Sequence, residues 1–168
     1  MAIIKDIISD EERAFYGAKN DTFVNIKITG EADGESSFKE CQDVIVQDSY
    51  FNLRYPFWHN EKVLLNNIEM TSNCRAALWY SNNITLLNSQ LDGIKVFREC
   101  NNINVKDTVI NSPEPFWFCD DIKITKGSIK GEYAFLQSSN IEIHNLHFSG
   151  KYSFQYVKNL EIENSYID

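Results

Sequence analysis

The most constraining feature of the sequence is a repeat of 19 residues. Each copy has two apolar residues two positions apart, and seven copies follow one another: Val44/Val46, Val63/Leu65, Ile84/Leu86, Ile103/Val105, Ile122/Ile124, Ile141/Ile143 and Leu160/Ile162. Successive copies are 19 residues apart except for one step of 21, and a weaker eighth copy, Asp21/Phe23, begins 23 residues before Val44. The longer steps indicate insertions of about four residues around Glu31–Gly34 and two around Asn73–Arg75.

Two further rows of apolar residues keep the same period. Seven residues after the start of each copy stand Ile28, Phe51, Met70, Leu91, Ile110, Ile129, Phe148 and Ile167. Six residues before it stand Phe15, Phe38, Phe57, Leu78, Phe97, Phe116, Phe135 and Phe154. Val, Ile and Phe at alternating positions favour short strands over helices. If the copies stack in register, the phenylalanines form one internal column, because like side chains then lie above like.

Polar residues mark corners between the strands. The position before each copy holds Asn20, Asp43, Lys62, Asn83, Asn102, Asp121, Asn140 or Asn159, and the fifth position holds Asn25, Asp48, Asn67, Asn88, Asp107, Lys126, Asn145 or Asn164. Asn and Asp tolerate the left-handed backbone conformation and hydrogen-bond their own turns. Short strands and corners closing every 19 residues predict an all-β, single-stranded parallel β-helix of about seven to eight turns.

The two ends of the chain leave alternatives open. Residues 1–20 are expected to form an N-terminal cap or a partial turn, and residues 21–168 the β-helix. Ser9 and Glu12 have the spacing of a helix capping box, whereas Phe15 and Ala18 fit a partial turn. The last copy stops in mid-turn, so we expect a fragment of a longer protein or an open end that self-associates end to end.

Composition narrows the class of protein. The net charge of -8 disfavours nucleic acid as a partner, and no apolar stretch is long enough to cross a membrane. The N-terminus becomes acidic too early for a signal peptide, so we expect a soluble cytoplasmic protein. Three of the four cysteines, Cys41, Cys100 and Cys119, share one small-residue row, which indicates buried thiols. We expect neither a metal site nor a cofactor.

All three tryptophans fall in one row, directly after the phenylalanine row, which reads Lys39, Trp58, Trp79, Arg98, Trp117, Leu136 and Gln155. Successive strand residues point to opposite faces, so this row is expected to point outward. Trp58, Trp79, Arg98 and Trp117, with His59 beside them, are the candidate binding residues. They could form a flat stacking platform for a sugar ring or a protein partner, or a loop or second subunit could cover them.

Charged residues near this row suggest a second hypothesis. Arg75, Arg98, Glu99 and Glu114 could serve a polysaccharide lyase or glycoside hydrolase, which needs a carboxylate pair or a base beside a cation. The insertions are short, however, and supply little material for the walls of a cleft. The first hypothesis is therefore a non-catalytic scaffold that binds a carbohydrate or a protein, and the third is a structural rod that assembles end to end.

Several runs of the sequence also carry a family resemblance: Ala32–Ser36, Leu53–His59, Cys74–Ser81, Gly93–Cys100 and Gly150–Tyr156. Through them the chain resembles a bacterial family of unknown function with a pectin-lyase-like parallel β-helix. The resemblance covers essentially the whole chain and implies a right-handed winding. It also implies further turns beyond Asp168, and it supplies no catalytic residues. Pectin-lyase-like describes a fold, which says little about function.

Overall fold

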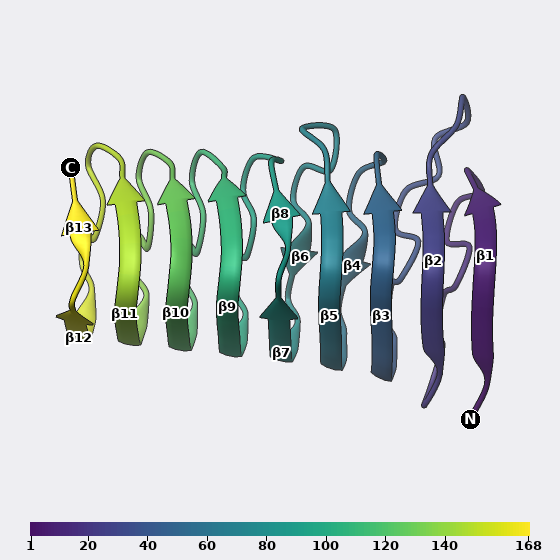
Figure 1. Ribbon diagram of the computed structural model, residues 1–168, viewed down its shortest axis with the longest axis horizontal. Helices are drawn as coiled ribbons and strands as arrows, with labels where there is room; N and C mark the ends of the chain where they lie inside the picture. Colours follow the sequence, from purple (N-terminus) through teal and green to yellow (C-terminus); the bar gives the residue numbers. More distant parts are fainter.

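The chain forms a parallel β-solenoid in a computed structural model that describes residues 1–168. Nine strand positions lie side by side along the rod, one for each turn (Figure 1). They are β1 (Ile3–Ser9), β2 (Thr22–Ile28), β3 (Gln42–Phe51), β5 (Glu61–Met70), β7 (Asn82–Leu87) with β8 (Gln90–Leu91), β9 (Asn101–Asn111), β10 (Asp120–Lys130), β11 (Ser139–Ser149), and β12 (Lys158–Glu163) with β13 (Tyr166–Ile167). The predicted parallel β-helix is confirmed. The structure contains no helix, and hence none that could span a membrane.

The register follows the sequence repeat. Val44 pairs with Val63, Val63 with Ile84 and Ile84 with Ile103, and the same row continues to Leu160. All sixteen predicted corner residues have positive φ. The side-chain amides of neighbouring corners also bond one another, as where Asn102 Nδ2 donates to Asn83 Oδ1 at 2.7 Å. The corners are therefore both left-handed turns and ladders of hydrogen bonds along the rod.

The first turn extends the repeat beyond the eight copies seen in the sequence. β1 pairs in parallel with β2, with Ile4 opposite Phe23 and Ser9 opposite Ile28. Residues 1–20 therefore contain a strand and a turn rather than a helix, and Phe15 packs against the core. The row of apolar residues in the sequence does not include this copy, because Ser9 is polar at the position where later copies carry a buried apolar residue.

The phenylalanine row lies inside the rod. Phe38, Phe57, Phe97, Phe116 and Phe135 are all 0% exposed. Phe97, Phe116, Phe135 and Phe154 form one continuous stack, with ring centroids 4.6, 4.8 and 5.0 Å apart. Leu78 separates this stack from that of Phe38 and Phe57, whose centroids are 5.1 Å apart. Stacking adds about 0.5–1.5 kcal/mol per pair to the burial of the rings.

Small polar side chains satisfy the backbone where the ladder bends. The backbone N–H of Asn60 donates to Ser81 Oγ at 3.0 Å, and the backbone N–H of Cys41 donates to Asn60 Oδ1 at 2.8 Å. The Cys119 N–H likewise donates to Ser138 Oγ. Buried N–H groups without a partner are costly, which explains why this interior row holds Asn60, Ser81 and Ser138 among its cysteines rather than large apolar residues.

The two insertions project from the same edge of the rod. The connection after β2 and the connection after β5 rise beyond the carboxyl ends of the long strands (Figure 1). Behind the long sheet lies a second, short parallel sheet of β4 (Phe57–Trp58) and β6 (Leu78–Trp79). The tryptophan row belongs to this second sheet, and the insertions flank its first members.

Candidate functional site

The tryptophan row is continuous along the second sheet. Trp58 pairs with Trp79 in β4 and β6, and isolated parallel bridges continue the row from Trp79 to Arg98 and from Arg98 to Trp117. The structure thus brings four of the five predicted binding residues into one register. All three indoles are half-buried.

The ring faces of the tryptophans are turned along the rod rather than toward solvent. The Trp58 and Trp79 rings are parallel within 7°, with centroids 5.1 Å apart. Arg98 Cζ lies 5.2 Å from the Trp79 centroid. The row therefore does not present a flat open platform. Turns stacked in register at a spacing of about 4.8 Å bring large planar side chains face to face. The exposed parts are ring edges.

Each indole also forms a hydrogen bond to the backbone of the next turn. The Nε1–H groups of Trp58, Trp79 and Trp117 donate to the backbone carbonyl oxygens of Ala76, Lys95 and Tyr133, at 2.6, 2.7 and 2.6 Å. These three acceptors occupy equivalent positions in three copies of the repeat. The tryptophans thus have a structural role in holding the turns together.

A small hollow of about 180 Å³ opens beside the first two tryptophans. It is lined by Tyr55, Trp58, Arg75, Ala76, Trp79, Ile94 and Lys95. The Tyr55 ring packs against Trp58, with centroids 4.7 Å apart. We call this feature the aromatic hollow. Its walls are aromatic and aliphatic, and its rim carries two cations, which is the usual make-up of a small-molecule site.

A polar network joins the aromatic hollow to the first insertion. Arg75 Nη2 donates to the Tyr55 hydroxyl at 3.1 Å, and Arg54 Nη1 donates to the same oxygen at 3.4 Å. Arg54 also binds both carboxylate oxygens of Asp33, with Nε to Oδ1 at 3.1 Å and Nη2 to Oδ2 at 2.5 Å. The hydrogen bonds from Arg75 and Arg54 lower the pKa of the Tyr55 hydroxyl, and Arg54 likewise lowers the pKa of Asp33.

The second insertion is held firmly in place. Cys74 is fully buried, and its Sγ lies 3.0 Å from the carbonyl oxygen of Phe51. On the other side, Gly93 of the following turn packs against the Cys74 carbonyl, where a Cβ atom would be only 2.3 Å from that oxygen. Because Cys74 is anchored on both sides, Arg75 projects outward from a fixed backbone.

The predicted catalytic residues do not converge. Arg98 Nε and Glu99 Oε2 are 3.8 Å apart, and Lys95 Nζ and Glu114 Oε2 are 3.7 Å apart. Arg75 joins neither pair and bonds Tyr55 instead. Each carboxylate thus lies beside its own cation.

His59, the remaining predicted binding residue, stacks on a tyrosine at the edge of the row. Its ring is parallel to that of Tyr80 within 15°, with centroids 4.9 Å apart. The sequence interpretation missed Tyr55, Ile94 and Lys95. Tyr55 and Lys95 occupy one row, two residues before the phenylalanines, which also holds Ser36, Ala76, Glu114, Tyr133 and Tyr152. That row keeps the period, so its adjacency to the tryptophans could have been found.

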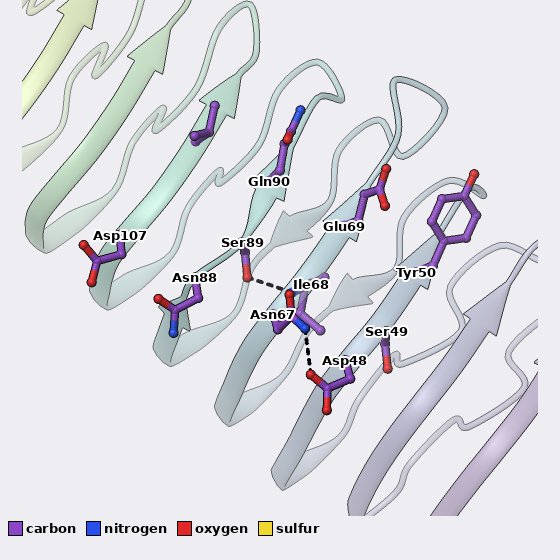
Figure 2. A pocket seen from close by; sticks show the side chains of 11 residues that line it. Asp48, Ser49, Tyr50, Asn67, Ile68, Glu69, Asn88, Ser89, Gln90 and Asp107 are labelled. Atoms are coloured by element: carbon purple, nitrogen blue, oxygen red, sulfur yellow. Dashed lines mark hydrogen bonds between the residues drawn. The ribbon is translucent and has the colours of Figure 1, made fainter.

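A polar groove runs across four turns on the long sheet (Figure 2). Asp48, Asn67, Asn88 and Asp107 form one row at its edge, and Tyr50, Glu69 and Gln90 form a second. The first row holds the left-handed corner residues that bend the strands. Asn67 Nδ2 donates to Asp48 Oδ1 at 2.7 Å, and the Ile68 N–H donates to Ser89 Oγ at 3.0 Å. The groove follows from the bend, and these bonds stabilise it.

The chain offers no evident metal ligands. No group of three or more His, Cys, Asp and Glu side chains converges. The four cysteines are free and buried. Desolvation raises the pKa of the Cys41 thiol to about 11 and that of Cys74 to about 12.

The chain matches one protein family and has weak similarity to solved structures. Residues 2–168 match the family described as "Protein of unknown function (DUF3737)". No curated protein matches the chain. Among solved structures, the full-length form of QnrB1, a plasmid-mediated fluoroquinolone resistance protein, is 10% identical with a TM-score of 0.26, over 100% of this chain and 94% of that chain. A trypsin-treated form is 11% identical with a TM-score of 0.24, over 99% and 91%. Scores this low carry no further argument.

Proposed function

Because the chain belongs to the DUF3737 family of proteins of unknown function, we propose from its own geometry that it is a non-catalytic scaffold that binds a carbohydrate. The site is the aromatic hollow, with the edges of Trp58 and Trp79 as one wall. Arg98 and His59 flank it, and Trp117 lies one turn beyond Arg98. The right-handed, pectin-lyase-like winding and the cytoplasmic location expected from the sequence belong to the same proposal.

The single observation that supports this function most is the composition of the aromatic hollow. Tyr55 and the exposed edges of Trp58 and Trp79 provide rigid apolar surfaces, and the Tyr55 hydroxyl and the Arg75 guanidinium stand at the rim. Aromatic groups with a polar tip suit ligands that are apolar on one side and polar and hydrated on the other. A sugar ring has this character, because its C–H faces are apolar and its edge carries hydroxyl groups.

The arrangement of charges favours binding over catalysis. General acid–base catalysis needs a donor or acceptor that faces the reacting bond and is free to exchange a proton. Glu99 and Glu114 lie beside Arg98 and Lys95 instead. A protein partner and end-to-end association remain alternatives, and the experiment below separates them from a carbohydrate ligand.

The test is a titration of tryptophan fluorescence with a panel of neutral and acidic mono- and oligosaccharides. At least one sugar is expected to change the emission saturably, and an Ile94→Glu variant is expected to lose that response, since Ile94 lines the hollow and is 41% exposed. The matched control is Ile45→Glu, at a 37% exposed position on β3, which should respond like the parent protein. No response to any sugar, or release of a cleaved product, would contradict the proposal.

A further inference from the structure

We infer that the aromatic hollow selects a sugar that carries a carboxylate, and that Arg75 with the Tyr55 hydroxyl forms the subsite for this carboxylate. The inference rests on the proposed function and adds the chemical class of the ligand.

The first argument is charge. Arg54 pairs with Asp33, Lys95 with Glu114 and Arg98 with Glu99. Arg75 is exposed and has no carboxylate partner, although the chain has a net charge of -8. It is therefore the cation at the rim whose charge is not neutralised by the protein. Arginine in such a position presents a planar set of N–H donors that matches a carboxylate.

The second argument is the direction of the hydrogen bonds at Tyr55. Its hydroxyl oxygen accepts from both Arg75 and Arg54, at 3.1 and 3.4 Å. The O–H proton is then left to donate outward. A carboxylate placed at the rim would accept one bond from the Tyr55 O–H and others from Arg75. The lowered pKa of Tyr55 makes its O–H a stronger donor than an ordinary tyrosine.

The third argument is the origin of these residues. Arg75 lies in the two-residue insertion, and Asp33, which orients Arg54, lies in the four-residue insertion. These are the two places where the chain departs from its period. Regular turns would stack without them, and each insertion adds one charged residue to the polar network around the Tyr55 hydroxyl.

The fourth argument is size. The hollow of about 180 Å³ is smaller than the ~300–1,000 Å³ of a typical ligand pocket. It suits a single acidic sugar unit, free or at the end of a chain. A long polyanion is disfavoured, because the net charge of -8 repels it.

The experiment compares D-glucuronate with D-glucose, which share a ring and differ at one carboxylate, by calorimetric titration at fixed ionic strength. D-Glucuronate is expected to bind at least about tenfold more tightly. Arg75→Gln should lower the affinity for D-glucuronate about ten- to a hundredfold, the range of a hydrogen bond to a charged group, and should leave D-glucose unchanged. Lys62→Gln, an exposed cation paired with Asp43, is the matched control and should bind like the parent protein.

Two further arms separate the outcomes. Acetate alone should bind much more weakly than D-glucuronate, since it lacks the ring that fills the hollow, and equal binding of the two would overturn the inference. Equal binding of D-glucose and D-glucuronate would also overturn it while leaving the proposed function in place. If no sugar binds, neutral or acidic, both fail together.

Discussion

The Nη2 atom of Arg75 lies 3.1 Å from the hydroxyl oxygen of Tyr55, although 20 residues separate them in the chain. The contact exists because one turn of the solenoid carries two extra residues. Those residues extend the connection after β5 and bring a cation to the rim of the aromatic hollow. The regular turns provide a rigid frame, and the departures from the period provide the polar groups that distinguish one side of the rod.

The Asp33–Arg54 pair predicts a pH-dependent contribution to stability. Arg54 lowers the pKa of Asp33 from its ordinary value of 3.8. The stabilisation is therefore complete above that value, and is lost as the pH falls through the lowered value in the folded protein. The urea midpoint of Asp33→Asn should lie below that of the parent at neutral pH, and the difference should shrink in acid. In an Arg54→Gln background, Asp33→Asn should have little further effect; a constant difference at all pH values would contradict this account.

The phenylalanine stack predicts a large effect of one truncation. Phe116→Ala removes a fully buried ring between Phe97 and Phe135 and should lower the free energy of unfolding by about 3–5 kcal/mol. Tyr156→Ala, at a 77% exposed position, should change it by less than about 0.5 kcal/mol. Urea denaturation followed by circular dichroism measures both. Equal losses in the two variants would show that the stack does not carry the core.

The corner residues predict different losses of stability for two small substitutions. Asn102 has a φ of 59°. Asn102→Ala should cost about 1–2 kcal/mol, because alanine keeps the Cβ atom that is strained in the left-handed region and loses the polar side chain that offsets this strain in asparagine. Asn102→Gly removes the same side-chain bond to Asn83 but accepts positive φ without strain, so it should cost less. Thermal unfolding of the pair tests this, and a glycine variant weaker than the alanine variant would be evidence against a left-handed corner.

The burial of the cysteines predicts that their thiols react slowly in the folded protein. All four thiols are buried, and burial raises the pKa of Cys41 to about 11 and of Cys74 to about 12. Because the thiolate is the reactive form, a disulfide reagent at mildly alkaline pH should label the folded protein very slowly. After denaturation it should label four thiols per chain. Rapid labelling of any cysteine in the folded state would mean that its row is not interior.

The period alone predicts most of the fold. In-register stacking repeats each environment every turn, so Phe116 and Phe135 could be assigned to the core, and Asn102 to a corner, without coordinates. For the first turn the sequence left a helical cap and a partial turn as alternatives, because an edge turn can carry the polar Ser9 where interior turns need an apolar side chain.

The site was less predictable, for two physical reasons. The row of Trp58 and Trp79 could be read from the sequence, but their ring planes depend on side-chain torsions and on the Nε1–H bonds to the next turn. The contact between Arg75 and Tyr55 depends on how an inserted connection folds back over the preceding turn. A repeat pattern predicts the structure of positions that recur in every turn. An insertion occurs in one turn only, so no other copy shows how it folds.

The central claim, that a sugar occupies the aromatic hollow, is tested most directly by the indole signals in a ¹H–¹⁵N correlation spectrum. The protein has three tryptophans, and each Nε1–H is hydrogen-bonded to a carbonyl of the next turn. Titration with D-glucuronate should move the Trp58 and Trp79 signals together and leave the Trp117 signal in place. Three unmoved signals, or a shift of Trp117 alone, would contradict the account.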